Sequence, residues 1–363
     1  MIAPPPPLAF APDVLAAIED GADIVFSLSG GKDSSAAGLA VTEFLDSVGH
    51  PAEKRRSIHA DLGMIEWQST PSLVTEIASI LRTPLTTVAR KAGGLIHRWE
   101  QRWQSSLDRF ERLETYQLVS PWSSAKLRYC TSETKVAPIG SRLRRDYAGR
   151  TVISVVGIRR EESSARAATP VWRRDSRFAP VGNRAGTVML TWHPILDWTA
   201  EDVFAFHTSR NLPLHEAYAL NSTRLSCSYC VLASLNNLSV ASLAPGNHPS
   251  FRRITALETR SAFSFQPSRW LADVSPHLLS DAELAASQRA RRTALRRRTL
   301  EATLPADLRF KRGWPPRVPT KTEAVAIASV RDAILRANGR PNHWPHPSDV
   351  RDRFAELHIA KAA

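Results

Sequence analysis

The sequence contains few cysteines and no long apolar run. Three cysteines occur among 363 residues, at Cys130, Cys227 and Cys230. An odd and sparse set of this kind argues against a fold held together by disulfides. No stretch of about 18 apolar residues is present, so a membrane span is not expected. The first residues also lack the basic, apolar and cleavage regions of a secretion signal. We therefore expect a cytoplasmic protein that does not contact a membrane.

Negative charge is scarce relative to positive charge. The chain has 48 lysine and arginine residues against 35 aspartate and glutamate residues, which gives a formal net charge of +13. An excess of this size favours contact with polyanions, above all with nucleic acid such as tRNA or DNA. A soluble enzyme from an arginine-rich proteome has the same balance, and the charge alone does not separate these two interpretations.

Short apolar runs alternate with segments of helical periodicity through the first 210 residues. This alternation predicts a doubly wound, mostly parallel α/β sheet of the Rossmann-like type, in which ligands bind beyond the carboxyl ends of the strands. The expected strands are residues 22–29, 55–63, 84–90 and 151–158, and the expected helices are residues 33–48, 70–81, 199–210 and 320–337. We expect a proline-rich, solvated lead-in over residues 1–20, a nucleotide-binding domain over 21–240 that includes the late cysteine pair, and a basic helical extension over 245–363.

A glycine turn follows the first expected strand, in the stretch FSLSGGKDSSAAGLA, residues 26–40. Glycines allow backbone N–H groups to approach phosphate oxygens, and the amino end of the following helix adds partial positive charge. Lys32 adds a full charge. The pattern differs from the Gly-x-x-x-x-Gly-Lys-Ser/Thr loop of kinases and from Gly-x-Gly-x-x-Gly. A turn with a Lys32–Asp33 surface pair is the structural alternative.

Five segments in order resemble one family. They are SLSGGKDSSA, HADLGMIEW, VVGIRREESSARA, HPILDWTAEDVFAF and LPLHEAYALNSTRLSCSYC, which together span about residues 22–235. These segments resemble the phosphoadenosine phosphosulfate reductase family of the PP-loop ATP pyrophosphatase superfamily. Members of that superfamily cleave ATP between the α and β phosphates and adenylylate a substrate atom.

The resemblance implies a set of site residues that bind ATP together with Mg²⁺. It implies catalytic roles for Lys32, Asp33, Arg159 and Arg160. It implies nucleotide contacts from these four residues and from Ser27, Ser29, Gly30, Gly31, Ser34, Asp61, Gly63, Gly157 and Arg166. The arginine block can equally be a solvated turn neutralised by Glu161 and Glu162. Asp61 can bind a ribose hydroxyl or Mg²⁺, or it can cap its own turn.

The three cysteines are candidate metal ligands. Three thiolates suit a [4Fe–4S] cluster that leaves one iron free of protein sulfur, and related proteins also use a cysteine at the position of Cys130. A zinc site completed by His193 or His215, a redox Cys-x-x-Cys and buried structural thiols are the alternatives. The spacing of the cysteines does not choose among them.

The chain also departs from the reductases it resembles. Reductases of this family attack sulfate sulfur with a cysteine near the C-terminus, but no cysteine follows Cys230, and Tyr129-Cys130 stands where iron–sulfur members have a cysteine pair. We therefore expect an ATP-dependent sulfurtransferase that acts on nucleic acid and receives sulfur from a donor such as a cysteine desulfurase. A sulfonucleotide reductase and a non-catalytic subunit of a DNA modification or defence complex are the alternatives. The oligomeric state is left open, with a homodimer among the options.

The late region is rich in arginine and tryptophan. Six arginines fall within Arg289–Arg298, where they can neutralise several phosphates, and Trp270, Trp314 and Trp344 can stack on unpaired bases. The structural alternative is a solvated helix face, with tryptophans that close a small helical cap.

Overall fold

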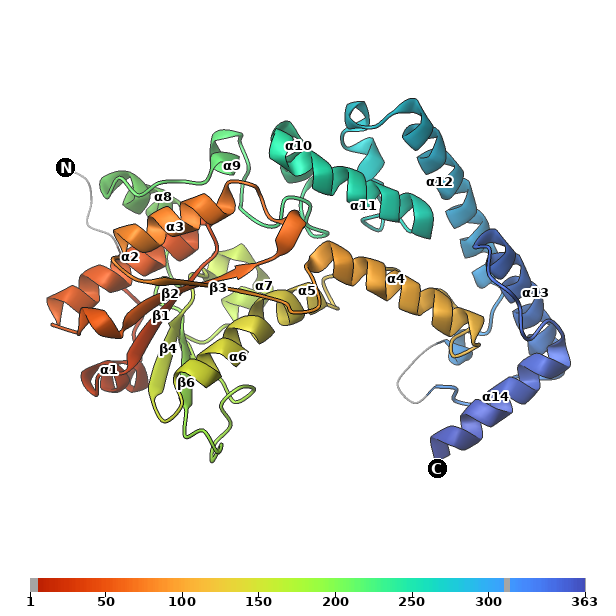
Figure 1. Ribbon diagram of the computed structural model, residues 1–363, viewed down its shortest axis with the longest axis horizontal. Helices are drawn as coiled ribbons and strands as arrows, with labels where there is room; N and C mark the ends of the chain where they lie inside the picture. The colour runs from red at the N-terminus through yellow and green to blue at the C-terminus, as the bar shows by residue number, and fades with distance from the viewer. Residues whose placement is uncertain (1–5, 310–313, 363) are drawn as a thin grey trace. The chain divides into compact units, whose positions relative to one another are not determined.

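The chain folds into two compact units in a computed structural model that describes residues 6–309 and 314–362 (Figure 1). The first, which we call the sheet unit, takes its residues from 1–95 and 125–248. The second, which we call the helical unit, takes its residues from 96–124 and 249–363. The expected boundary near residue 245 therefore lies close to one break. The early segment 96–124 differs from the expectation, because it belongs with the late residues.

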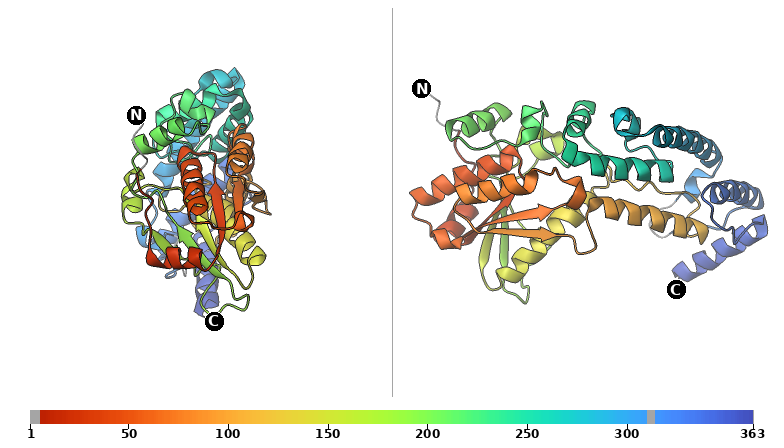
Figure 2. Two further views of the ribbon diagram at one scale, coloured as in Figure 1. Left: turned by 90° about the vertical axis from the view of Figure 1, so that its left-hand side faces the viewer. Right: turned by 45° about the horizontal axis from the view of Figure 1, so that its top comes forward.

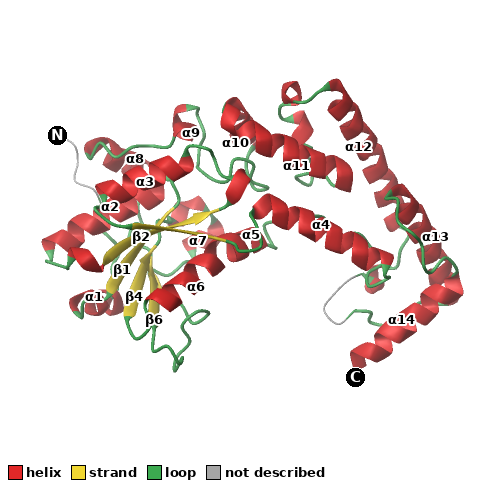
Figure 3. Cartoon of the chain, viewed as in Figure 1, coloured by secondary structure: helices red, strands yellow, loops and turns green. Residues whose placement is uncertain are grey.

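The strands form one mostly parallel sheet in the described residues (Figure 3). Their order is β3-β2-β1-β4-β6-β5, and β5 alone among these strands is antiparallel to its neighbour, β6. The bounds are β1 Asp23–Leu28, β2 Arg55–Asp61, β3 Leu85–Ala89, β4 Thr151–Val155, β5 Trp172–Arg174 and β6 Val188–Trp192. The expected α/β fold is thus confirmed, and β4 is shorter than expected because the chain turns towards Gly157.

The strand order reverses at β1. Strands β2 and β3 follow on one side of β1, whereas β4 and β6 lie on the other. The chain segments that leave β1 and β4 therefore diverge, and a crevice opens between them at the carboxyl edge of the sheet. The glycine turn leaves β1 at this place.

Helices cover both faces of the sheet (Figure 2). Alternate β1 residues Ile24, Phe26 and Leu28 pack in one core with α1, α2, α3 and α8, whereas Val25 faces the core under α6. This alternation is the two-residue period of a strand buried on both faces. The helices of this unit are α1 Pro12–Glu19, α2 Lys32–Ser47, α3 Thr70–Ile80, α5 Tyr129–Thr131, α6 Ala137–Asp146, α7 Ser164–Ala167, α8 Ala200–Ser209, α9 Glu216–Ala219 and α10 Leu235–Leu243, with a π-helical turn at Ser132–Val136 between α5 and α6.

The expectation of a solvated lead-in is wrong for its described part, residues 6–20. Helix α1 buries Val14 and Ile18 in the core of the sheet unit. The Trp192 indole donates a hydrogen bond of 2.7 Å to the Ala9 carbonyl oxygen, and the Trp198 indole donates one of 3.2 Å to that of Pro7. The prolines thus precede a packed helix. Residues 1–5 lie outside the described residues.

The helical unit is built around aromatic side chains from both of its segments. Trp99 and Trp122 meet edge to face at 5.3 Å between ring centroids, and both rings lie against Phe265. The helices are α4 Leu95–Glu111, α11 His248–Ser261, α12 Asp281–Glu301, α13 Lys321–Ala337 and α14 Pro347–Ala362. The expected helix that ends before Asn338 is confirmed as α13. No described helix is both long enough and apolar enough to span a bilayer.

The late tryptophans take part in packing within the helical unit. The Trp314 indole donates to the Leu308 carbonyl oxygen at 2.8 Å and its ring meets Phe354, while Arg291 lies over Trp270 and Arg353 over Trp344. These contacts support the interpretation of the tryptophans as closing a helical cap. Stacking on bases stays a prediction.

Candidate functional site

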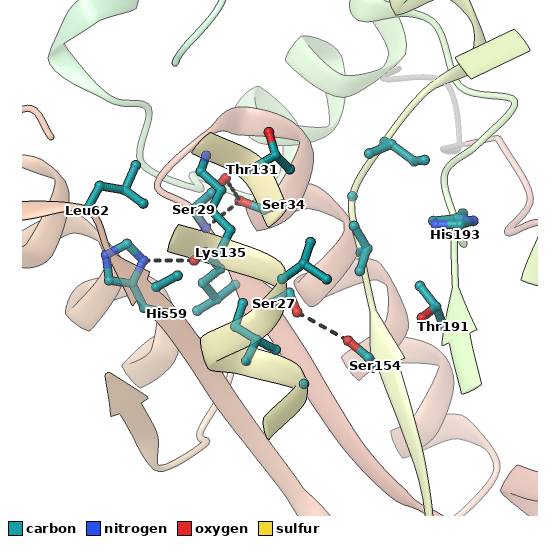
Figure 4. A pocket seen from close by; sticks show the side chains of 18 of the residues that line it. Ser27, Ser29, Ser34, His59, Leu62, Thr131, Lys135, Ser154, Thr191 and His193 are labelled. Carbon is teal, nitrogen blue, oxygen red and sulfur yellow. Dashed lines mark hydrogen bonds between the residues drawn. The ribbon is translucent and has the colours of Figure 1, made fainter. Parts of the chain in front are cut away.

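A cavity of about 440 Å³ lies at the carboxyl edge of the sheet (Figure 4). It is bordered by the glycine turn, by the ends of β1, β2 and β4, and by the π-helical turn. The Ser27 and Ser154 hydroxyl oxygens are 3.3 Å apart across the reversal between β1 and β4. Of the expected site residues, the cavity is lined by Ser27, Ser29, Ser34, Gly157, Arg166 and Cys227.

The glycine turn is shaped by a short hydrogen-bond network. Gly30 has a φ of +71°, a conformation that favours glycine, and the Ser34 hydroxyl donates to the Gly31 carbonyl oxygen at 2.9 Å. The Ser29 backbone N–H in turn donates to the Ser34 hydroxyl oxygen at 3.2 Å. Helix α2 then begins at Lys32, whose backbone N–H donates to the Tyr218 hydroxyl oxygen at 3.4 Å, and its N-cap residue is Gly31, which has no side chain. The turn therefore presents hydroxyls and a helix amino end to the cavity, as a phosphate site requires.

Gly157 allows the β4 turn to approach the glycine turn closely. A Cβ atom at this position would lie 2.2 Å from the Asp33 carbonyl oxygen, which is closer than any real contact. The glycine is thus needed for backbone to pack on backbone. Its place is consistent with a nucleotide contact, which stays a prediction.

Lys32 and Arg159, two of the basic residues expected to contact phosphate, are both bound to the carboxylate of Asp33. Asp33 accepts from Lys32 Nζ at 2.9 Å and from Arg159 Nε at 2.5 Å, and Arg159 also pairs with Glu161. The Lys32 and Arg159 side chains are only 3% and 6% exposed. Burial opposes the charge of Arg159, but Asp33 and Glu161 more than offset it, so its pKa is raised. Neither cation lines the cavity in this structure, so a contact with phosphate requires their side chains to turn.

Arg160 and Asp61 take part in local structure. Arg160 pairs with Asp197 at 2.6 Å and donates to the Ala167 and Thr169 carbonyl oxygens, which fixes the segment around α7. Asp61 caps its turn by accepting from the Gly63 N–H at 2.7 Å. The Asp61 contact matches the interpretation of this residue as the cap of its own turn, whereas the partner of Arg160 is Asp197 and neither Glu161 nor Glu162. The catalytic and binding roles expected for these residues, and for Gly63, stay predictions.

Positive charge gathers at the β6 side of the cavity. Arg166 and Arg173 line it beside His193, whose pKa is lowered by burial and by these two charges. Arg166 also pairs with Glu162. His193 Nδ1 lies 2.8 Å from the Pro170 carbonyl oxygen. Arg173 is exposed, Arg166 is 36% exposed, and the carboxylate of Asp175 also lines the cavity, so solvent and this carboxylate weaken the attraction of the two arginines for an anion.

Two lining residues, His59 and Lys135, were not expected from the sequence. His59 lies at the end of β2, with Nδ1 2.9 Å from the Leu28 carbonyl oxygen and Nε2 3.3 Å from Glu66. Burial opposes its charge, but Glu66 offsets this effect and the pKa of His59 is raised. A histidine near the carboxyl end of an expected strand, as in RRSIHAD, was the available signal, because ligands bind at that end of a parallel sheet. Lys135 lies on the π-helical turn, and such turns are frequent at functional sites.

Of Cys130, Cys227 and Cys230, Cys227 is the one that lines the cavity. Burial raises the pKa of its thiol to about 12, the charge of Lys135 acts against this rise, and Cys230 and Cys130 add to it. Three soft thiols fit iron or zinc in donor chemistry. However, no three His, Cys, Asp or Glu side chains are placed to hold a metal ion in the described ranges. The present arrangement therefore does not form a cluster site, and the cluster stays a prediction.

His215, one of the two histidines named with His193 as a possible fourth zinc ligand, is engaged in other contacts. His215 Nε2 lies 3.1 Å from both the Ser69 and the Thr70 hydroxyl oxygens, and Nδ1 accepts from the Ala217 N–H at 3.1 Å. Burial lowers its pKa to about 4, so the ring is neutral at pH 7. His215 thus ties α3 to α9.

A family model that matches most of the sheet unit shows which protein family the chain belongs to. The family model of the phosphoadenosine phosphosulfate reductase domain matches residues 23–233, which include every element around the cavity. The chain belongs to this family. The expected resemblance is thereby confirmed for the phosphoadenosine phosphosulfate reductase family, and the match ends before the late arginine-rich region.

Two further comparisons place the chain among known proteins. It is similar to an uncharacterized 37.8 kDa protein from the gpa 5′ region of Escherichia phage 186, with 31% identity over 117 residues, or 32% of this chain. That match spans 33% of the phage protein's length. The fold is similar to a phosphoadenylyl-sulfate reductase from Candida auris solved as a phosphate complex, at 16% identity and a TM-score of 0.37, over 59% of this chain and 85% of that one.

Proposed function

We propose that this member of the phosphoadenosine phosphosulfate reductase family is an ATP-dependent sulfurtransferase whose acceptor is a nucleic acid. The observation that carries the proposal is that one cavity is lined both by the serines of the glycine turn and by Cys227. Phosphate-binding groups and a sulfur atom of the chain thus share a site. The surplus of positive charge, +13 overall, supports an anionic acceptor.

The first step is adenylylation of the acceptor. ATP, with Mg²⁺, lies with its phosphates on the turn from Ser29 to Ser34. An acceptor oxygen attacks the α-phosphorus, the bond to the β-phosphate oxygen breaks, and pyrophosphate leaves. Arg166 and Lys135 are placed to offset the charge that develops, as preorganised cations do in a buried site. Lys32 contributes when its ammonium group leaves Asp33.

The second step is displacement of AMP by sulfur. A donor such as a cysteine desulfurase delivers sulfur as a persulfide, and a thiol reductant, itself oxidised to a disulfide, releases that sulfur as hydrosulfide. The hydrosulfide forms a carbon–sulfur bond, and the carbon–oxygen bond to AMP breaks. Cys227 is the chain's own sulfur atom in the cavity. A cluster held by Cys130, Cys227 and Cys230 would supply a binding place for that sulfur. In the described residues the side chains as they stand do not form that site.

Pyrophosphate release tests this function. We expect release from ATP to depend on the acceptor, in a panel of tRNA, single-stranded DNA and duplex DNA. Arg166→Gln, at the cavity wall, should lower turnover at least tenfold, and Lys32→Ala should abolish it. Arg184→Gln removes the same charge from an exposed position away from the cavity and should leave turnover unchanged. Turnover that survives Lys32→Ala would remove the turn from the mechanism.

Two other outcomes have their own readouts. Sulfite release from phosphoadenylyl or adenylyl sulfate would favour a sulfonucleotide reductase, which the family match supports. ATP binding without pyrophosphate release on any acceptor would favour a non-catalytic nucleotide-binding subunit. Anaerobic purification tests the metal expectation, since iron–sulfur ligation gives broad absorbance near about 400 nm. Zinc content without that absorbance would favour the zinc alternative.

A further inference from the structure

The helical unit contains a cavity of its own, with a volume of about 310 Å³. It lies between the end of α11, the middle of α12 and the end of α13. Four arginines line it, Arg260, Arg289, Arg296 and Arg297, and no carboxylate is among the lining residues that the structure describes. A cavity with cations and no acidic counterpart is a place for an anion.

Three of these arginines are exposed. Within residues 6–309 and 314–362, the side chains of Arg289 and Arg296 form no ion pair or hydrogen bond. The charge of Arg260 helps to lower the pKa of Glu100, but the ion pair of Glu100 is with Arg253. Some arginines of this unit pair, as Arg291 does with Asp273, whereas the exposed Arg292 and Arg298 of α12 have no side-chain partner in the described residues. What sets Arg289 and Arg296 apart is that both line one cavity.

Arg297 forms the floor of the cavity. It donates to the Ala262 carbonyl oxygen at 3.0 Å, lies over the Phe263 ring at 3.5 Å and is within 3.8 Å of Glu301. Burial lowers its pKa to about 10, so it is still charged at pH 7. This side chain fastens α12 to the end of α11, and α12 presents Arg289 and Arg296 from a fixed helix.

The spacing favours a chain of phosphates over a single anion. Arg289 and Arg296 are seven residues apart, about two helical turns or roughly 10 Å along α12. Thr259 and Thr293 add hydroxyls, and apolar side chains such as Leu300 complete the wall. Phosphate, sugar hydroxyl and sugar carbon contacts are the ones that position a nucleic-acid strand.

The sequence places most of the surplus charge in this unit. Residues 96–124 and 249–363 contain 25 arginine and lysine residues against 15 aspartate and glutamate residues, so they carry 10 of the 13 net positive charges. The sheet unit is nearly neutral by comparison. Charge asymmetry of this kind between two parts of a chain indicates a polyanionic partner.

We propose that the arginine cavity of the helical unit, lined by Arg260, Arg289, Arg296 and Arg297, binds the sugar–phosphate backbone of a nucleic-acid strand. Binding here is independent of sequence, because phosphate contacts position a strand without reading its bases. The proposal stands on the cavity itself. It relies on the proposed function only for identifying the bound strand as the acceptor of sulfur.

Oligonucleotide binding tests this proposal. The affinity of the full chain for labelled single-stranded DNA and RNA is measured by fluorescence anisotropy from low to moderate salt. We expect Arg289→Gln with Arg296→Gln to weaken binding at least tenfold. The slope of log K against log salt should fall by about one to two, since each lost phosphate contact removes roughly 0.7–0.9 of slope.

The matched control removes the same charge from the same helix. Arg292→Gln with Arg298→Gln changes two exposed arginines outside the cavity and should weaken binding less than threefold. Equal losses in both pairs would overturn the proposal, because general charge would then explain binding. Tight binding of inorganic phosphate, or of anionic phosphatidylserine vesicles in place of oligonucleotides, would overturn it as well.

ATP affinity separates this proposal from the proposed function. Both arginine pairs should leave ATP binding unchanged, because the cavity in the sheet unit contains none of these residues. Oligonucleotide binding that depends on Arg289 and Arg296 in a chain without pyrophosphatase activity would support this proposal and contradict the proposed function. The melting temperature should be unchanged in both pairs, because all four side chains are exposed or line open space.

Discussion

The two units bury charge in different ways. In the sheet unit a carboxylate, Asp33, neutralises two buried cations, Lys32 and Arg159. In the helical unit two buried charges, those of Glu258 and Arg331, are satisfied by backbone groups. Glu258 accepts from the N–H groups of Phe265, Leu271 and Ala272, and Arg331 donates to the Phe110 and Glu111 carbonyl oxygens.

This difference determines where charge is available for a ligand. Cations that already hold a carboxylate offer little to a phosphate until they exchange partners. Because backbone groups satisfy Glu258 and Arg331, these buried charges do not need Arg289 or Arg296 as a partner. The guanidinium groups of Arg289 and Arg296 are therefore available to a ligand in the cavity that they line. Lys32 and Arg159 of the sheet unit thus belong to a preformed ion network beside its cavity, whereas Arg289 and Arg296 of the helical unit line their cavity without an ion pair in the described residues.

The largest expected effect comes from removing the shared carboxylate. Asp33→Ala leaves Lys32 and Arg159 buried, with Glu161 as the remaining partner of Arg159. We expect a loss of about 3–5 kcal/mol in the free energy of unfolding, because a buried cation without its partner is costly. Urea denaturation followed by circular dichroism measures it. A loss below about 1 kcal/mol would mean that the pairs are not buried as described.

The next effect concerns the close approach of the two turns. Gly157→Ala would place a Cβ atom 2.2 Å from the Asp33 carbonyl oxygen, so the β4 turn must shift. We expect about 1–3 kcal/mol of destabilisation, together with loss of ATP binding by calorimetry. Gly49→Ala, at a surface turn with a φ of +71° and open space around it, should cost about 1 kcal/mol and leave ATP binding unchanged. Normal ATP binding by Gly157→Ala would show that the contact does not shape the site.

One residue of each unit, His215 and Glu258, should make the free energy of unfolding change with pH, and the two contributions should have opposite signs. His215 has a pKa lowered to about 4, so the unfolded chain binds more protons and stability rises between about pH 4 and 6.5. Glu258 has a pKa raised to about 7 by burial, so the folded chain binds more protons and stability falls between about pH 4.5 and 7.

Each slope is tested by its own variant. His215→Asn should remove the rising contribution, which is on the order of 3 kcal/mol at most, and Glu258→Gln should remove the falling one. Thermal melts from pH 4 to 8 measure both. His59, whose pKa is raised, adds a falling contribution as pH rises through the value in the folded chain, so the variants are compared with the parent at each pH. If the contributions of His215 and Glu258 to stability changed with pH in the same direction, the contrast between these two buried groups would be wrong.

The smallest expected effect is at an exposed pair. Arg210 and Glu43 form a two-fold contact of 2.7 and 3.3 Å, but both side chains are more than a third exposed. Glu43→Ala should change stability by less than about 1 kcal/mol, and added salt should reduce the effect. A loss comparable with that of Asp33→Ala would show that burial does not separate the two kinds of pair.

The sheet and the glycine turn could be predicted because their signals are local. A strand, two glycines and a helix start occur within fifteen residues, and apolar periodicity marks each element. The ion network could not be predicted, since Arg159 and Asp33 are 126 positions apart and either one reads as a surface residue. His59 and Lys135 escaped notice because nothing in their neighbours indicates that both face one cavity.

The division of the chain was harder still. Composition changes visibly near residue 245, and in residues 96–124 the apolar side chains Trp99, Trp103 and Phe110 recur at helical spacing. This period indicates a helix that packs on one face, but it does not say which residues cover that face. Only pairing with late aromatics such as Phe265 shows where Trp99 and Trp122 belong.

The discontinuous helical unit has a consequence for biosynthesis. Residues 96–124 leave the ribosome well before residues 249–363, which complete the unit. At roughly 5–20 residues per second, the delay is on the order of ten seconds. Throughout that interval Trp99 and Trp103 lack Phe265 and Phe263, the late aromatic side chains that they meet in the folded unit, so their apolar surface stays uncovered until translation reaches the arginine-rich half.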